Sequence, residues 1–165
     1  MTILKCVFAL KYSQKETEKA CCIMKKYKIS YYIGAALSLA VGIWHFFVPS
    51  MFMWDTYISY KVLTASVNYV NLCFSFLLCG ISLIMLLWGK KVFGGNREAA
   101  VIFGFFVLLW IFRVTVALLN PMPPEANVFM SYGQLVGSVV VMILLVIPFA
   151  KLMISAYSRK NDGDI

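Results

Sequence analysis

Arg113 is the residue with the most chemical consequence in this sequence, because it stands inside the long apolar stretch FFVLLWIFRVTVALL. A guanidinium surrounded by hydrocarbon costs free energy on the order of 1–3 kcal/mol even toward a membrane interface, so such residues face a polar interior and find partners. None of the apolar stretches contains Asp or Glu. A counter-ion would therefore have to fold back from a loop, and Asp55 and Glu125 are the two loop carboxylates available.

A small set of polar residues accompanies Arg113 toward the same end of the predicted helices. The candidates for a shared polar pocket are His45, Asp55, Asn68, Asn71, Tyr132 and Gln134. In one interpretation Arg113 supplies a positive charge and His45 a hydrogen-bond donor to an anion or a polar headgroup. In the other, Arg113 bonds backbone carbonyls and Asn71 and locks the helices together. Both interpretations remain open from the sequence alone.

Catalytic and metal chemistry find little support. The chain has one histidine, and its five cysteines show no metal-ligand spacing. An enzyme would need a positioned acid–base pair or a cofactor motif, and neither pattern is present. We therefore predict no catalytic residue, no metal and no cofactor.

The elements that must position these residues are four apolar runs, at 29–48, 67–88, 99–119 and 128–149. Each has the roughly 20 residues that a helix needs to cross the hydrocarbon of a bilayer. The chain is 62% hydrophobic, more than a soluble domain of this size could bury. The runs lack the two-residue alternation of barrel strands. The prediction is an all-α polytopic membrane protein, an antiparallel bundle of four transmembrane helices.

The distribution of basic residues predicts how the bundle is oriented. Seven lysines precede the first run, three basic residues follow the second and three follow the fourth. The loop after the first run has only Lys61, and the loop after the third has none. Basic loops remain cytoplasmic, so we predict a cell-membrane protein with both termini inside. The formal charge of +8 then indicates attraction to anionic lipid rather than to nucleic acid.

The division of the chain follows from this topology. Residues 1–28 form a basic cytoplasmic segment, 29–153 the transmembrane domain and 154–165 a cytoplasmic tail. The first 23 residues are either an extension upstream of a start at Met24 or an amphipathic helix on the membrane. The aromatic loop after the first run predicts a short interfacial helix over 50–60, serving as a membrane anchor or as a lid.

Small residues at helical spacing predict where the helices pack. Gly34, Ser38, Gly42 and His45 share one face of the first helix. Gly133 and Gly137 form a Gly-x-x-x-Gly pattern in the fourth, which allows close helix approach within the bundle or in a homodimer.

The segment GIWHFFVP at 42–49, four helices of this length and an arginine late in the third resemble DoxX-like small membrane proteins. The resemblance implies an antiparallel four-helix bundle in a prokaryotic-type membrane, in a family that includes subunits associated with quinone-linked oxidoreductases. It assigns no catalytic residue. The predicted role is binding of a lipid-like or small amphipathic ligand in the polar pocket, or service as a membrane accessory subunit. The alternatives are a small dimeric transporter and a membrane subunit of a quinone-linked oxidoreductase.

Overall fold

A computed structural model of the chain describes residues 2–51, 53, 56, 58–120 and 128–162, and the side chains of those between 25 and 156 except 128–131. Four long helices account for nearly all of these residues: α1 (Thr2–Met51), α3 (Lys61–Phe93), α4 (Arg97–Leu119) and α5 (Val128–Asp162). The all-helical fold predicted from the sequence is confirmed. Asp55 and several neighbours in the segment predicted as an interfacial helix lie outside the described residues.

Each helix contains a stretch long and apolar enough to cross a membrane: Lys25–Met51, Lys61–Phe93, Arg97–Leu119 and Tyr132–Ala156. The outward faces carry large apolar side chains with no protein against them, such as Phe76, Leu87 and Leu119, each more than 70% exposed. A water-soluble protein does not present four such faces, whereas lipid solvates them. The chain is a multi-pass integral membrane protein.

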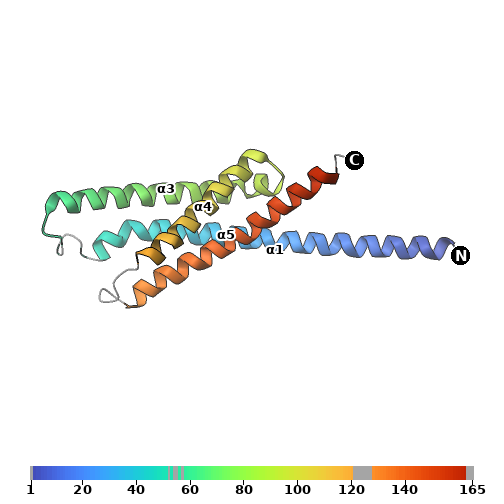
Figure 1. Ribbon diagram of the computed structural model, residues 1–165, viewed down its shortest axis with the longest axis horizontal. Coiled ribbons are helices and arrows are strands. Elements are labelled where there is room, and N and C mark those ends of the chain that lie inside the picture. Colours follow the sequence, from blue (N-terminus) through green and yellow to red (C-terminus); the bar gives the residue numbers. More distant parts are fainter. Residues whose placement is uncertain (1, 52, 54–55, 57, 121–127, 163–165) are drawn as a thin grey trace.

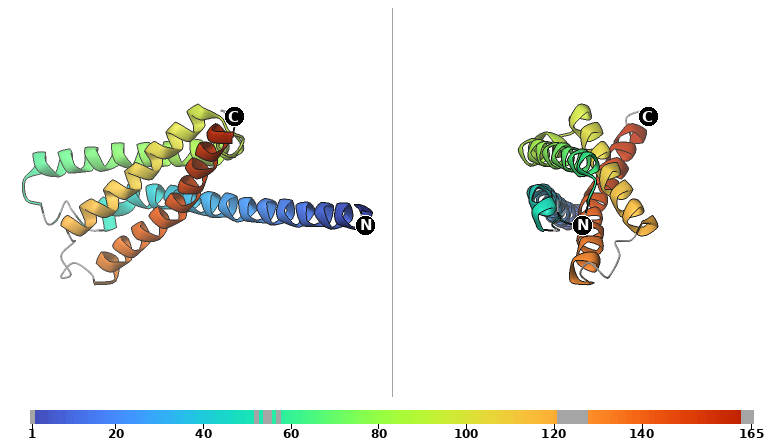
Figure 2. Two further views of the ribbon diagram at one scale, coloured as in Figure 1. Left: turned by 45° about the vertical axis from the view of Figure 1, so that its right-hand side comes forward. Right: turned by 90° about the vertical axis from the view of Figure 1, so that its left-hand side faces the viewer.

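The helices form two antiparallel pairs that cross each other (Figure 1). α1 and α3 run side by side, and α5 packs against both α1 and α4. Both termini lie at one end of the bundle, and the first half of α1 continues beyond the bundle at that end (Figures 1 and 2). We call this the basic end, since Lys90 and Lys91 also lie there. The distal end is where α1 and α4 finish and α3 and α5 begin.

Two glycines set the spacing of α1 against its neighbours. A Cβ added at Gly42 would lie 2.7 Å from Cys79 Sγ and 3.1 Å from the Cys79 backbone nitrogen on α3. A Cβ at Gly34 would lie 2.9 Å from the Leu145 side chain on α5. The small-residue face predicted for the first helix is therefore a packing face. Close backbone approach of this kind is a main source of helix association in membranes.

The tightly packed core occupies the basic two-thirds of the bundle. Tyr31 lies at its centre, with Phe93 and Phe103 edge-on to its ring at centroid distances of 5.4 and 4.9 Å. The Tyr31 hydroxyl donates to the Met85 carbonyl oxygen at 2.6 Å, which satisfies the one polar atom of this aromatic cluster. Toward the distal end, most residues apart from Thr64 become half-buried or exposed, and the polar site lies where this change occurs.

Candidate functional site

Arg113 on α4 contacts all four helices. Its Nε donates to Ser138 Oγ on α5 at 3.1 Å, and its Nη2 lies 3.0 Å from His45 Nε2 on α1. The guanidinium carbon is 5.8 Å from the ring centroid of Phe74 on α3 and 5.6 Å from that of Trp110. Aromatic faces at this distance attract a cation through their quadrupoles. Hydrogen bonds and cation–π contacts thus place the positive charge at the point where the four helices meet.

The hydrogen bond between Arg113 and His45 determines the state of the imidazole. A guanidinium only donates, so His45 Nε2 must accept, and the ring is neutral with its proton on Nδ1. The Asn71 amide lies beside the ring, yet Nδ1 is buried without an acceptor in hydrogen-bond geometry among the described residues. His45 is therefore a neutral partner of Arg113 that retains one unused N–H.

The Arg113 guanidinium is not saturated by these contacts. It has five N–H groups, of which two are used. Nη1 makes no hydrogen bond to the described residues, and it is not among their buried unpaired atoms. Nη1 therefore has its two N–H groups unused by the part of the chain that the structure describes. Every hydrogen-bond partner of the guanidinium is neutral, so its charge is uncompensated within the described structure.

Asn71 has a different task, set by a proline in α1. Pro49 lies inside α1, four residues after His45, and has no N–H to donate to the His45 carbonyl. Asn71 Nδ2 on α3 donates to that carbonyl oxygen instead, at 2.7 Å. Among the described residues, Arg113 therefore bonds neither Asn71 nor a backbone carbonyl, in contrast to the interpretation in which these groups hold it. Asn71 repairs the backbone of α1, and Arg113 bonds two side chains.

The same arrangement recurs on α5. Pro148 lies inside that helix and leaves the Leu144 carbonyl without its usual intrahelical donor. Ser30 Oγ on α1 donates to the Leu144 carbonyl oxygen at 2.9 Å. Both helix prolines are therefore tolerated because a polar side chain from a neighbouring helix bonds the exposed carbonyl, as the hydrocarbon environment requires.

The remaining predicted site residues are placed less centrally. Asn68 lies one turn from Asn71 toward the distal end, and its Oδ1 is buried without a partner among the described residues. Gln134 lies four residues from Ser138, on the same face of α5, but is exposed. Tyr132 is 62% exposed on another face. The structure thus joins Arg113, His45 and Asn71 in one layer, with Asn68 and Gln134 on its distal side.

A second polar layer, not predicted from the sequence, lies nearer the basic end. Trp110 Nε1 donates to Ser38 Oγ at 3.0 Å, Ser38 lies 2.8 Å from Ser82 Oγ, and Ser82 donates to the Leu78 carbonyl oxygen at 2.7 Å. Because Ser82 gives its proton to Leu78, Ser38 must donate to Ser82. The indole N–H of a tryptophan inside an apolar run is the signal that predicts such an acceptor.

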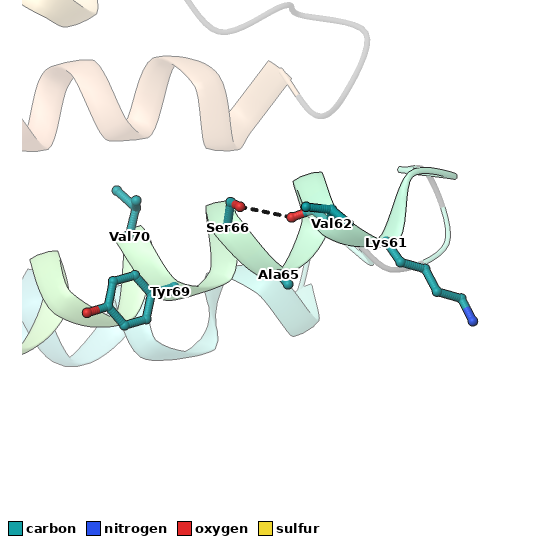
Figure 3. A pocket seen from close by; sticks show the side chains of 6 residues that line it. All are labelled: Lys61, Val62, Ala65, Ser66, Tyr69 and Val70. Atoms are coloured by element: carbon teal, nitrogen blue, oxygen red, sulfur yellow. Dashed lines mark hydrogen bonds between the residues drawn. The ribbon is translucent and has the colours of Figure 1, made fainter.

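A shallow depression elsewhere on the surface does not form a site. All the residues around it come from the first turns of α3, with their side chains spread along one helix (Figure 3): Lys61, Val62, Ala65, Ser66, Tyr69 and Val70. Ser66 bonds its own helix at the Val62 carbonyl oxygen, 2.9 Å away. Because the residues that line the depression all come from one helix, their polar groups do not converge on a ligand.

Histidine, cysteine and carboxylate side chains do not cluster in groups suited to a metal ion among the described residues. Comparison of the chain with family models, with curated proteins and with solved structures found no match. The function therefore has to be argued from the geometry around Arg113.

Proposed function

We propose that this integral membrane protein binds the anionic head of a lipid-like or small amphipathic ligand at Arg113. The observation that carries the proposal is a guanidinium between transmembrane helices whose hydrogen-bond partners among the described residues are neutral and whose Nη1 donates to none of those residues. A phosphate or carboxylate is the natural partner of these unbonded N–H groups, since charge-assisted pairs with Arg are strong and often bidentate.

The energetics favour a ligand over a purely structural arginine. A charge between membrane helices carries a desolvation cost of several kcal/mol that neutral partners compensate only in part. Neutral donors such as Gln or Ser would join His45 and Ser138 with less of that cost. An anion that arrives with the ligand would offset the charge and would use the N–H groups of Arg113 that the described residues leave unbonded.

The site also suits an amphipathic molecule rather than a water-soluble one. Arg113 is half-buried in a helix whose other faces are apolar, with Phe112 69% and Leu108 61% exposed to lipid. A ligand that pairs with Arg113 therefore has hydrocarbon beside it. A molecule with an anionic head and an apolar tail satisfies both surroundings.

Native mass spectrometry of gently extracted protein tests the proposal. The wild type should carry a bound small molecule that is lost in Arg113→Leu. Arg97→Leu is the matched control, because Arg97 is the exposed arginine at the other end of the same helix. Arg97→Leu should keep the bound molecule. If Arg113→Leu keeps the same ligand at the same occupancy, Arg113 is a structural lock and the proposal is wrong.

A membrane accessory subunit or a small dimeric transporter is the second candidate. A Cβ added at Gly133 or Gly137 meets nothing within 4 Å, so no described residue packs against this Gly-x-x-x-Gly pattern. A second helix could approach it closely. Disulfide crosslinking of Gly133→Cys, with the native cysteines replaced by alanine, should trap a dimer; a monomer-only result speaks against a transporter built on this face. A DoxX-like subunit of a quinone-linked oxidoreductase stays a prediction.

A further inference from the structure

We infer that the ligand head is a phosphodiester with a free hydroxyl group, of the phosphoglycerol type, and that Gln134 recognises the hydroxyl. The inference rests on the proposed function, in which Arg113 holds the anion. It adds the chemical class of the head and a residue on α5 that selects it.

The position of Gln134 follows from Ser138, whose hydroxyl is fixed by Arg113 at 3.1 Å. Four residues of helix place Gln134 about 6 Å closer to the distal end, on the same side of α5 as Ser138. Gln134 is exposed there, whereas Ser138 is only 3% exposed. Its carboxamide is therefore free to bond a group that lies just distal to the guanidinium.

α4 also carries an exposed carboxamide distal to Arg113, that of Asn120. Asn120 is the C-cap of α4, seven residues after Arg113, and is exposed. Seven residues are close to two helical turns, so both residues lie on the same face, about 10 Å apart along the helix. The positive charge thus has neutral carboxamides distal to it on two helices. Carboxamides both donate and accept, which suits hydroxyl groups.

The orientation of a membrane lipid matches this order. In either leaflet the acyl chains point toward the midplane and the alcohol of the head points toward water. A phosphodiester bound at Arg113, from the leaflet at the distal end, therefore places its alcohol on the distal side, at the level of Gln134. A fatty acid has no such alcohol and would leave Gln134 without a partner.

Charge selects among phospholipid heads. One phosphodiester anion balances the one guanidinium. An ethanolamine or choline head would bring a second cation close to Arg113, where like charges repel each other. A choline group also has no hydrogen to donate to a carboxamide. A hydroxyl-bearing anionic head satisfies the charge and the hydrogen bonds together.

The test compares two lipids with identical acyl chains and identical charge. Phosphatidylglycerol carries hydroxyl groups, and phosphatidylmethanol carries the same phosphodiester without them. Delipidated wild-type protein, titrated with each in detergent and read by native mass spectrometry, should bind phosphatidylglycerol about fivefold more tightly, the value of about one net hydrogen bond. This comparison needs no variant and so does not depend on a mutant that folds.

Variants then assign the preference to its residue. Gln134→Leu should bind both lipids with equal affinity, close to that of wild type for phosphatidylmethanol. Tyr132→Leu is the control, because this exposed side chain two residues away lies on another face. It should keep the fivefold preference. Arg113→Leu should lose both lipids.

Different failures separate the two proposals. Equal binding of the two lipids by wild type, with loss of both in Arg113→Leu, overturns the hydroxyl inference and leaves the anion site standing. A preference that persists in Gln134→Leu overturns the assignment to Gln134. Equal binding by wild type and Arg113→Leu refutes the anion site itself. Displacement of the lipid by an equal concentration of sn-glycerol 3-phosphate makes the ligand a soluble phosphate ester and overturns the lipid class.

Discussion

Two polar layers lie only a few residues apart along this bundle and differ in how completely their groups are bonded. In the layer at Trp110, Ser38 and Ser82, each hydroxyl and the indole N–H has its partner, and all three residues are fully buried. In the layer at Arg113 and His45, the residues are half-buried, and neither Arg113 Nη1 nor His45 Nδ1 has a hydrogen-bond partner among the described residues.

This difference distinguishes polar groups that hold the helices together from polar groups that have donors left to bind a ligand. A closed chain of neutral hydrogen bonds has no donor or acceptor left for a ligand and stabilises the packing of the helices against one another. An incompletely bonded layer that also carries a net charge has both unused donors and a reason to attract an anion. We call the fully bonded layer at Trp110, Ser38 and Ser82 the closed layer, and the incompletely bonded layer at Arg113 and His45 the open layer. The closed layer should control the stability of the protein, and the open layer should control ligand occupancy.

The largest expected effect comes from breaking the closed layer. Trp110→Ala removes a large buried side chain and leaves Ser38 without its donor, so we expect a loss of about 3–5 kcal/mol in the free energy of unfolding. Phe112→Ala is the control, since this neighbour is 69% exposed to lipid and should lose less than about 1 kcal/mol. Unfolding by SDS titration measures both.

Ligand binding by Trp110→Ala tests whether the closed layer acts on stability and the open layer on ligand occupancy. The folded fraction of Trp110→Ala should still bind the anionic ligand, because the hydrogen bonds from Arg113 to His45 and Ser138 do not involve Trp110. Its affinity should fall only modestly, by the value of the lost cation–π contact between Arg113 and the indole ring. A stability loss no greater than that of Phe112→Ala would show that the closed layer does not stabilise the helix bundle.

The second largest effect concerns the helix contact between the two layers. Gly42→Ala places a Cβ 2.7 Å from Cys79 Sγ and 3.1 Å from a backbone nitrogen, so α1 and α3 must separate. Overpacking of this kind costs about 1–3 kcal/mol. Gly137→Ala, where an added Cβ meets nothing within 4 Å, is the matched control and should leave the thermal unfolding temperature unchanged. Equal shifts for both variants would contradict the packing described here.

Much of the fold was predictable because hydrophobic length and charge placement act locally. Four apolar runs of membrane-crossing length predict four helices whatever their neighbours are, and the structure contains helices over all four. The small residues of the first helix predicted its packing face, since an added Cβ at Gly34 or Gly42 would clash with a neighbouring helix. Which side of the membrane each end faces stays a prediction from the basic loops.

The site was predictable in its members but not in its bonding. An arginine and a histidine inside apolar runs are rare enough to identify without a structure. Their bonds depend on helix rotation and crossing, which one sequence does not determine. Asn71 illustrates the limit: it was grouped with Arg113 as a ligand-binding residue, and it bonds the carbonyl that Pro49 leaves unpaired. The proline four residues after His45 was the available signal.

The smallest effect concerns the hydrogen bond from Asn71 to the His45 carbonyl, which replaces the one that Pro49 cannot make. Removing it tests whether Asn71, beside Arg113 and His45, has a structural role or binds a ligand. Asn71→Leu removes the donor to the His45 carbonyl, and we expect a cost of about 1 kcal/mol, the usual scale for one such bond in a membrane protein. Pro49→Ala supplies a backbone N–H to the same carbonyl. In the Pro49→Ala background, Asn71→Leu should therefore cost much less.

The double-mutant cycle of Asn71→Leu and Pro49→Ala distinguishes a structural Asn71 from one that binds a ligand. If Asn71 mainly bonds a ligand, Pro49→Ala cannot rescue its loss, and the two free-energy changes will add. If it repairs α1, the cycle shows a coupling close to the whole cost of Asn71→Leu, and lipid occupancy at Arg113 stays near that of wild type. Ser30→Ala with Pro148→Ala should show the same coupling on α5, far from the open layer, which would make carbonyl repair a property of both proline-containing helices.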